Sequence, residues 1–225
     1  MSTLELGRPV GEFHRPFVIA AVDATRLGSI ELAIAAIDAA AANHCDAVKL
    51  TSLPWTWCAR LYNHADPRGI KLLTTVSDER SIERLDWFGT PAFEIFFDWA
   101  DLDLVTAAAR TGKPIVLSVA NATEAELAEV VALARRDGAG GIALVQRVTD
   151  SGLSSFDALR CHNTVVGISD HSGGPSLVRT AIGRGARIVE KRLSPRMFST
   201  DLAAVVRDCD LAWALLGNVD EWTTN

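Results

Sequence analysis

The chain has 225 residues, of which 48% are hydrophobic and 22% are charged, and its formal net charge is -6. This length and composition suit one compact domain with a full core, and the acidic balance argues against nucleic-acid binding through a broad basic face. No apolar run reaches the ~20 residues of a membrane span, the N-terminus holds no signal peptide, and the four cysteines are far apart, so we expect free thiols, a cytoplasmic protein and no membrane partner.

Short apolar, β-branched segments recur along the chain and predict eight strands. They start roughly 25 residues apart, which leaves room for one strand, one helix and two turns. The predicted strands are 17–22, 46–50, 71–75, 92–97, 114–118, 141–145, 164–168 and 187–191.

Helical patterns fill most of the intervals between these strands. Thr123 and Glu126 have the spacing of a capping box, which predicts the start of one helix at Glu124. Only a short turn near 155–159 is expected between the sixth and seventh strands. The predicted helices are 30–42, 54–65, 81–88, 102–110, 124–136, 176–183 and 202–216.

Eight β-α repeats in a chain of this length are typical of a TIM (β/α)8 barrel. A doubly wound parallel sheet shows the same alternation and stays the alternative, because repeat count alone does not close a barrel. No linker-like run divides the chain, so we expect a single domain over residues 1–225. In either fold, chemistry collects at the C-terminal ends of the strands.

Polar residues are concentrated at these strand ends. Four of them are cations, and in an acidic protein their convergence favours a small anionic metabolite that carries a phosphate or a carboxylate. The structural alternative for each cation is that Lys and Arg often end strands because they reach solvent. The four are Lys49, Arg147, Lys191 and Arg192.

The tripeptide Ser169-Asp170-His171 follows a predicted strand and precedes two glycines. Asp170 and His171 can supply an acid–base pair or a metal ligand, and a capped strand-to-helix turn is the structural alternative. No HxH or HExxH spacing exists, which disfavours a zinc site. A divalent Mn or Mg ion with His171 as its single nitrogen ligand stays open.

Two motifs near the C-terminus are specific in combination: Gly167-Ile-Ser-Asp-His171, and Gly185-Ala186 followed by Glu190-Lys191. Further segments precede them in a fixed order at 17–20, 28–29, 47–50, 69–75, 112–118 and 122–123. In this order, from about residue 16 to 193, the chain resembles the catalytic barrel of the N-acetylneuraminate (sialic acid) synthase family.

The resemblance implies condensation of phosphoenolpyruvate, or a similar small anionic metabolite, with a sugar aldehyde in carbohydrate biosynthesis, helped by a divalent Mn or Mg ion. His171 matches one of two metal-binding histidines, and Glu190 matches the acidic residue before the second. The positions that match the phosphoenolpyruvate pocket are Lys49, Thr75, Ser118 and Ser169. With the strand-end cations Arg147, Lys191 and Arg192 they form the candidate substrate ligands, and His171, Asp170 and Glu190 are the candidate catalytic residues.

Several positions depart from the pattern of the family. Arg192 stands where the second metal histidine is expected, and a guanidinium cannot ligate a metal. Glu94 replaces a phosphate-binding lysine, which reverses a charge contact. The antifreeze-like C-terminal domain of the family is expected to be absent. The remaining departures are Ala21 for glutamate, Thr25-Arg26 for Asn-His, Phe97 for serine and Gln146-Arg147 for His-Cys.

Two functions therefore stay open. The first is a diverged enzyme with aldol-type carbon–carbon chemistry, and the second is a binding or regulatory barrel that has lost the metal and phosphoenolpyruvate sites. The new charges suggest the hypothesis that Glu94 pairs with Arg147 or Arg192 across the mouth.

The last predicted helix carries apolar residues that are candidates for a contact between two copies of the chain. Trp213, Leu215 and Leu216 lie near its end, and Trp222 follows it. A patch of this kind predicts a homodimer.

Overall fold

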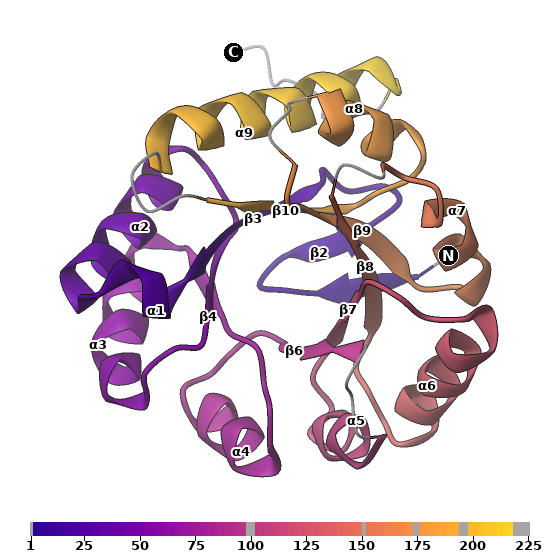
Figure 1. The fold of residues 1–225 in the computed structure, drawn as a ribbon, viewed down its shortest axis with the longest axis horizontal. Coiled ribbons are helices and arrows are strands. Elements are labelled where there is room, and N and C mark those ends of the chain that lie inside the picture. Colours follow the sequence, from indigo (N-terminus) through magenta and orange to yellow (C-terminus); the bar gives the residue numbers. More distant parts are fainter. Residues whose placement is uncertain (1, 98–101, 150–151, 173–175, 194–197, 218–225) are drawn as a thin grey trace, which may run out of the picture.

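Eight parallel strands form the centre of the computed structural model, which describes residues 2–97, 102–149, 152–172, 176–193 and 198–217 (Figure 1). Each strand forms from one of the eight apolar segments, as expected for strands that are buried on both faces. In chain order they are β3 (Phe17–Asp23), β4 (Ala47–Thr51), β5 (Lys71–Leu73), β6 (Phe93–Phe96), β7 (Ile115–Val119), β8 (Ile142–Val148), β9 (Val165–Asp170) and β10 (Ile188–Arg192).

The strands close into a barrel. Hydrogen-bonded neighbours follow the order β5-β4-β3-β10-β9-β8-β7-β6, so β3 and β10 join the two ends of the repeat series. The remaining gap between β5 and β6 is spanned by a parallel bridge between Thr75 and Glu94. At this seam the Val76 amide also donates to the Glu94 carbonyl at 2.9 Å. The predicted TIM barrel is confirmed, and the doubly wound sheet is wrong.

Helices surround the barrel and alternate with the strands (Figure 1). The capping box is confirmed, because the Glu126 amide donates to Thr123 Oγ1 at 3.3 Å and the Thr123 amide donates to Glu126 Oε2 at 2.8 Å. None of the helices in the described ranges is long and apolar enough to cross a membrane. They are α1 (Ala24–Leu27), α2 (Ile30–Ala42), α3 (Trp55–Ala65), α4 (Glu79–Trp87), α5 (Leu102–Ala109), α6 (Glu124–Arg136), α7 (Phe156–Leu159), α8 (Ser176–Gly183) and α9 (Phe198–Leu215).

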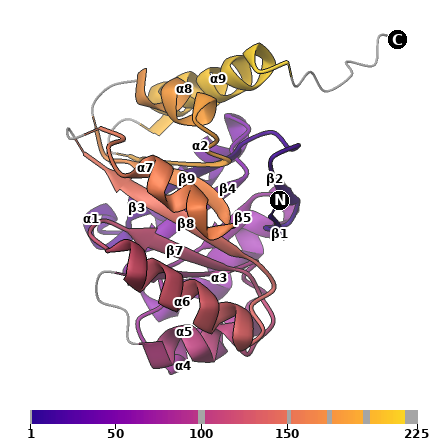
Figure 2. The same ribbon diagram turned by 90° about the vertical axis from the view of Figure 1, so that its right-hand side faces the viewer.

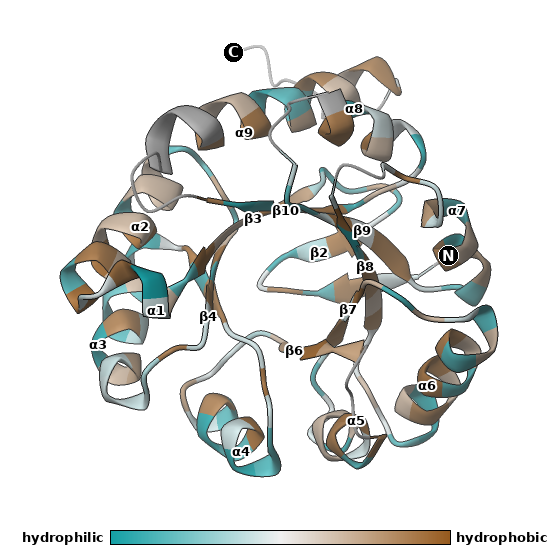
Figure 3. Ribbon diagram, viewed as in Figure 1, coloured by the Kyte–Doolittle hydropathy of each residue, from teal (hydrophilic) through white to brown (hydrophobic). Residues whose placement is uncertain are grey.

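The alternation of side chains along each strand separates two cores. Outward residues such as Val18 and Val48 pack against the helices, and α4 and α6 carry hydrophobic residues where they face the barrel and hydrophilic ones outside (Figure 3). Inward residues such as Phe17, Ile19 and Ile188 fill the lower half of the barrel.

A hairpin that the sequence analysis missed covers the N-terminal end of the barrel. β1 (Thr3–Glu5) and β2 (Pro9–Gly11) pair antiparallel, cross the centre of Figure 1, and lie at the end away from α1 in Figure 2. Leu4, Leu6 and Val10 join the inward cluster. Gly141 permits this close packing, because a Cβ there would lie only 2.6 Å from that of Leu4. The barrel therefore has an apolar floor.

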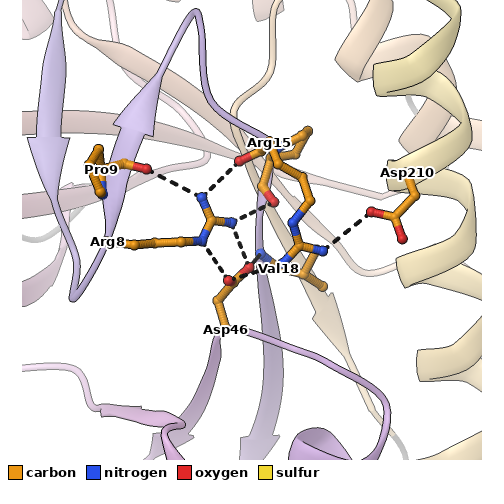
Figure 4. A network of polar contacts seen from close by, with 7 residues as sticks. Arg8, Pro9, Arg15, Val18, Asp46 and Asp210 are labelled. Atoms are coloured by element: carbon orange, nitrogen blue, oxygen red, sulfur yellow. Dashed lines mark hydrogen bonds and ion pairs between the residues drawn. The ribbon is translucent and has the colours of Figure 1, made fainter. Parts of the chain in front are cut away.

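Asp46, immediately before β4, ties the hairpin to the barrel (Figure 4). Arg8 donates from Nε and Nη2 to its carboxylate at 2.6 and 2.8 Å, and Arg15 Nη2 donates at 3.2 Å. The Val18 amide donates at 2.8 Å. Because the bidentate Arg8 and the Val18 amide share one carboxylate, Asp46 fixes the position of the hairpin relative to the start of β3.

Replacing Asp46 with alanine is expected to lower the free energy of unfolding by about 2 kcal/mol, because two guanidinium groups and an amide lose their acceptor. The carboxylate is only 10% exposed. Urea unfolding followed by tryptophan fluorescence measures the loss. Asp38→Ala removes a more exposed carboxylate that pairs with Arg68 and is the control, with an expected loss below about 1 kcal/mol. Equal losses would contradict the role of Asp46.

Trp213, which the sequence analysis placed in a homodimer patch, is buried instead. Only 5% of this residue is exposed, and the guanidinium of Arg187 lies over its ring at 5.1 Å from the ring centre. The helix turns Trp213 toward the barrel and leaves Leu215 and Leu216 exposed. Trp222 lies outside the described residues. Among the described residues the expected patch is therefore reduced to Leu215 at the end of α9 and Leu216 directly after it.

Candidate functional site

A cavity of about 210 Å³ lies at the carboxyl ends of the strands. Side chains point into the barrel at every second residue of a strand. The inward side chains near the carboxyl end of the strands are polar, and those nearer the N-terminal end are apolar. Six of the predicted site residues line the cavity. They are Lys49, Arg147, Ser169, His171, Glu190 and Arg192.

Lys49 lies at the inner end of this cavity between two carboxylates. Its ammonium nitrogen is 2.7 Å from Glu94 Oε1 and 2.6 Å from Glu190 Oε2. The side chains of the three residues are about 5% exposed or less. The hypothesis of a pair between Glu94 and an arginine is corrected here, because the ion pair of Glu94 within the described ranges is with Lys49. Glu94 faces inward beside β4 and β5 rather than out toward the mouth.

The two carboxylates of this triad surround one cation, which shifts the protonation of its members. Burial raises the pKa of Glu94 to about 7, against the attraction of Lys49, and the nearby Glu190 carboxylate adds to the rise. Burial disfavours the ammonium of Lys49, but Glu190 and Glu94 outweigh that effect and raise its pKa. Lys49 therefore stays protonated, and Glu94 is the residue of this triad that titrates near neutral pH.

A chain of hydrogen bonds extends from this triad to the mouth of the cavity. Ser169 Oγ lies 2.6 Å from Glu190 Oε1 and 3.1 Å from His171 Nε2, and Arg192 Nη1 lies 3.3 Å from His171 Nδ1. A guanidinium is only a donor, so Nδ1 accepts from Arg192. Nε2 of the neutral ring then carries the proton and donates to Ser169, which donates to Glu190. We assign this tautomer from the network.

His171 is half-buried and is held neutral in this network. Burial lowers its pKa, Glu190 opposes the shift, and the cations Arg192, Lys49 and Arg147 lower it further. A neutral imidazole with a protonated Nε2 can accept a proton at Nδ1 and pass another toward Ser169 and Glu190. The arrangement is thus a proton path between the mouth and a buried carboxylate.

Asp170 and Lys191 do not line this cavity. The alternation that turns Ser169 and Glu190 inward turns these two residues outward, where Lys191 Nζ donates to Asp170 Oδ2 at 2.7 Å. Asp170 Oδ1 also accepts from the amide and the hydroxyl of Ser172, at 2.8 and 2.7 Å. Within the described ranges Asp170 thus joins Lys191 to the backbone at Ser172.

The other two predicted ligands, Thr75 and Ser118, do not line this cavity. Thr75 pairs with Glu94 at the seam, and its buried hydroxyl has no hydrogen-bond partner among the described residues. Ser118 is buried on β7. Gln146, beside Arg147, turns outward and lines a separate cavity of about 440 Å³ near α6 and α7.

Sequence reasoning missed the contribution of Phe96 and Ser52 to the cavity. Phe96 lies on the inward face of β6, two residues after Glu94, so strand periodicity alone could have placed it there. Its ring centre is 5.9 Å from Lys49 Nζ. Ser52 follows β4 with a φ of 54°, a conformation for which serine gives no sequence signal.

The residues around His171 do not fit a divalent cation. Nδ1 faces the guanidinium of Arg192, and Nε2 faces the Ser169 hydroxyl, so both ring nitrogens are engaged. A positive group beside the only candidate imidazole repels a metal ion. Among the described residues no three His, Cys, Asp or Glu side chains come together in a way that could hold one. We therefore derive no step through a metal.

Several known proteins are similar to this chain. The NeuB family model matches residues 31–212. The pseudaminic acid synthase of Helicobacter pylori is 32% identical over 62% of this chain, which spans 44% of that protein's length. Pseudaminic acid synthase of Campylobacter jejuni is 24% identical over 81% of the chain, which spans 67% of it. The spore coat polysaccharide biosynthesis protein SpsE of Bacillus subtilis is 26% identical over 83% of the chain, and 62% of its length is matched.

Solved structures share the fold at lower identity. The N-acetylneuraminic acid synthetase of Leptospira borgpetersenii, in complex with citrate, has a TM-score of 0.86 at 22% identity. The match covers 100% of this chain and 93% of that one. A truncated 3-deoxy-D-arabino-heptulosonate 7-phosphate synthase of Thermotoga maritima has a TM-score of 0.77 at 18% identity; the match covers 96% of this chain and 93% of that one. These likenesses establish the barrel.

Proposed function

The chain belongs to the NeuB family, and on that premise we propose that it joins a small carboxylate-bearing metabolite to an aldehyde in carbohydrate biosynthesis. The resemblance to sialic acid synthases is confirmed at the level of the family. The observation that carries the proposal is the continuous path from Arg192 through His171 and Ser169 to Glu190 within one cavity. In such a path Arg192 is an electrophile at the mouth, and His171 and Glu190 can take up a proton.

Arg147 and Arg192 are the proposed anchors of the carboxylate. Both line the cavity, on β8 and β10, on either side of Ser169 and His171. Guanidinium groups match a carboxylate through paired N–H donors. The volume of about 210 Å³ is below the range of about 300 to 1,000 Å³ that holds drug-sized ligands, so the ligand is a small metabolite.

His171 is the proposed acid–base residue. When Arg192 turns from Nδ1 to the ligand, Nδ1 becomes free to take a proton, and Nε2 can pass its own proton through Ser169 to Glu190. The Arg192 guanidinium then lies near the ligand and stabilises negative charge that develops on a carbonyl oxygen. Ser169 and Glu190 act through His171 and position its ring.

A binding barrel without catalysis is the second candidate function. The observation that favours it is the internal neutralisation of Lys49 by two carboxylates, which removes a cation that a reacting ligand would otherwise meet. The two functions differ in their demand on His171, because only a catalyst needs its proton path.

Replacing Arg192 with methionine is expected to abolish the thermal stabilisation of the protein by pyruvate and phosphoenolpyruvate, the two carboxylate probes. At 100 times its dissociation constant a bound ligand stabilises by about 2.7 kcal/mol. Differential scanning fluorimetry measures the shift. Arg207→Met, which removes an exposed arginine on α9, is the control and should keep it. If neither probe stabilises the wild-type chain, the proposed function fails.

The enzyme and the binding barrel are separated by a second measurement. The chain is incubated with each carboxylate and a panel of sugar aldehydes, and adducts are detected by mass spectrometry. For the enzyme, His171→Ala keeps carboxylate binding and loses product at least about a hundredfold. Binding without product in the wild type would favour the second candidate.

A further inference from the structure

We infer that the cavity selects a 2-oxo acid with a single negative charge, in place of an enol phosphate, as the carboxylate partner. The inference rests on the proposed function and narrows its substrate class. It is carried by the charges around Lys49, whose ammonium is the cation that a phosphate deep in this cavity would need.

Two of the three N–H donors of Lys49 are already engaged. An ammonium has three N–H donors, and two of them are used by Glu94 at 2.7 Å and Glu190 at 2.6 Å. The face of the Phe96 ring lies within 5.9 Å on a further side, at cation–π distance. A phosphate that took the place of either ion-pair partner would have to displace a buried carboxylate.

The carboxylates cannot easily withdraw. Glu94 is 3% exposed and sits at the seam, where its backbone pairs with Thr75 and accepts from the Val76 amide. Glu190 is fixed by Ser169 as well as by Lys49. A ligand phosphate at the inner end of the cavity would therefore face two fixed negative groups.

The positive side chains that line the described part of the mouth are Arg147 and Arg192, and Asp23 lines it as well. The two arginines lie on β8 and β10, away from the β5–β6 seam. One carboxylate of the ligand can thus meet Arg147 and Arg192, while its uncharged end points inward.

The chemistry of a 2-oxo acid balances without a leaving group. The C–H bond next to its carbonyl breaks, and the proton passes to His171 Nδ1. The carbon atom left behind forms the new C–C bond to the aldehyde carbon, and the aldehyde oxygen takes up a proton and becomes a hydroxyl. No phosphate is released and no water is consumed, so the site needs no second anion pocket.

The test compares pyruvate and phosphoenolpyruvate, which share a three-carbon skeleton, by isothermal titration calorimetry at pH 8. The wild-type chain is expected to bind pyruvate at least tenfold more tightly than phosphoenolpyruvate. Glu94→Gln is expected to raise phosphoenolpyruvate affinity about tenfold or more, because a unit charge near the ligand is removed, and to change pyruvate affinity less than threefold. Glu129→Gln, which removes an exposed carboxylate on α6, should leave both affinities unchanged.

The outcomes separate this inference from the function on which it rests. Equal or tighter binding of phosphoenolpyruvate by the wild type would overturn the inference and leave the proposed function standing. Absence of binding by either compound would remove both. The comparison within the wild-type chain decides the matter even if Glu94→Gln folds poorly, and circular dichroism checks that the variants fold.

Discussion

Replacing Lys49 with methionine is expected to lower the free energy of unfolding by about 3 to 5 kcal/mol, the range found when one partner of a buried ion pair is removed. Methionine has a similar length and fills the space, so the loss reports charge. Glu94 and Glu190 would be left as neighbouring buried carboxylates without their shared cation. Chemical denaturation at pH 7.5 measures the effect.

Two further variants test the electrostatic origin of that loss. Lys49→Met combined with Glu94→Gln should recover a clear part of the stability, because one uncompensated charge is removed with the cation. Lys113→Met is the control, since Lys113 pairs with the half-exposed Asp86 and donates to the Thr90 carbonyl, and should cost about 1 kcal/mol. No recovery in the double variant would show that packing, and not charge, is the cause.

The second large effect is a pH dependence that originates at Glu94. Its pKa is about 7 in the folded chain against an ordinary value of 4.5, so the folded state binds this proton more tightly than the unfolded state does. The resulting stabilisation is complete below pH 4.5 and is lost as the pH rises through 7. At 1.36 kcal/mol per pKa unit, the change is up to about 3 kcal/mol.

The difference in unfolding free energy between the wild type and Glu94→Gln isolates this term, because other titrating groups are common to both. The wild type should lose stability relative to the variant between pH 4.5 and pH 7.5. The groups that face Glu94 are Lys49 and Glu190, and both remain in the variant. A difference that is flat across this interval would show that Glu94 keeps an ordinary pKa.

Much of the fold could be predicted from the sequence because it depends on local patterns. Buried parallel strands are continuous apolar runs, and the helices between them have clear periodicity and caps. The hairpin of β1 and β2 escaped prediction because each strand has three residues and its apolar side is defined by the barrel floor that it covers. Helix α1, with four residues, is likewise too short to show a period.

The candidate site was predicted in part, for a geometric reason. Lys49, Ser169 and Glu190 could be placed at strand ends. Whether such a residue faces the cavity depends on whether it lies an even or an odd number of positions from the inward core residues of its strand. Asp170 and Lys191 lie one position from inward residues and therefore face outward.

The partner of Glu94 is a separate case. Lys49 precedes it by 45 residues, and the two meet only because β4 and β6 are brought together around the barrel. The sequence analysis proposed Arg147 or Arg192 instead, because the sequence does not show which strand-end side chains meet across the barrel.

The apolar floor formed by Leu4, Leu6 and Val10 closes the N-terminal end of the barrel, so in the described part of the chain the cavity opens only at the carboxyl ends of the strands. Anything that reaches Lys49 from the mouth must leave by the way it came. Under the proposed function, a carboxylate bound at the inner end has to enter before the aldehyde that covers it. The proposed function therefore predicts an ordered sequential pattern in steady-state kinetics, with a saturating aldehyde trapping the carboxylate beneath it.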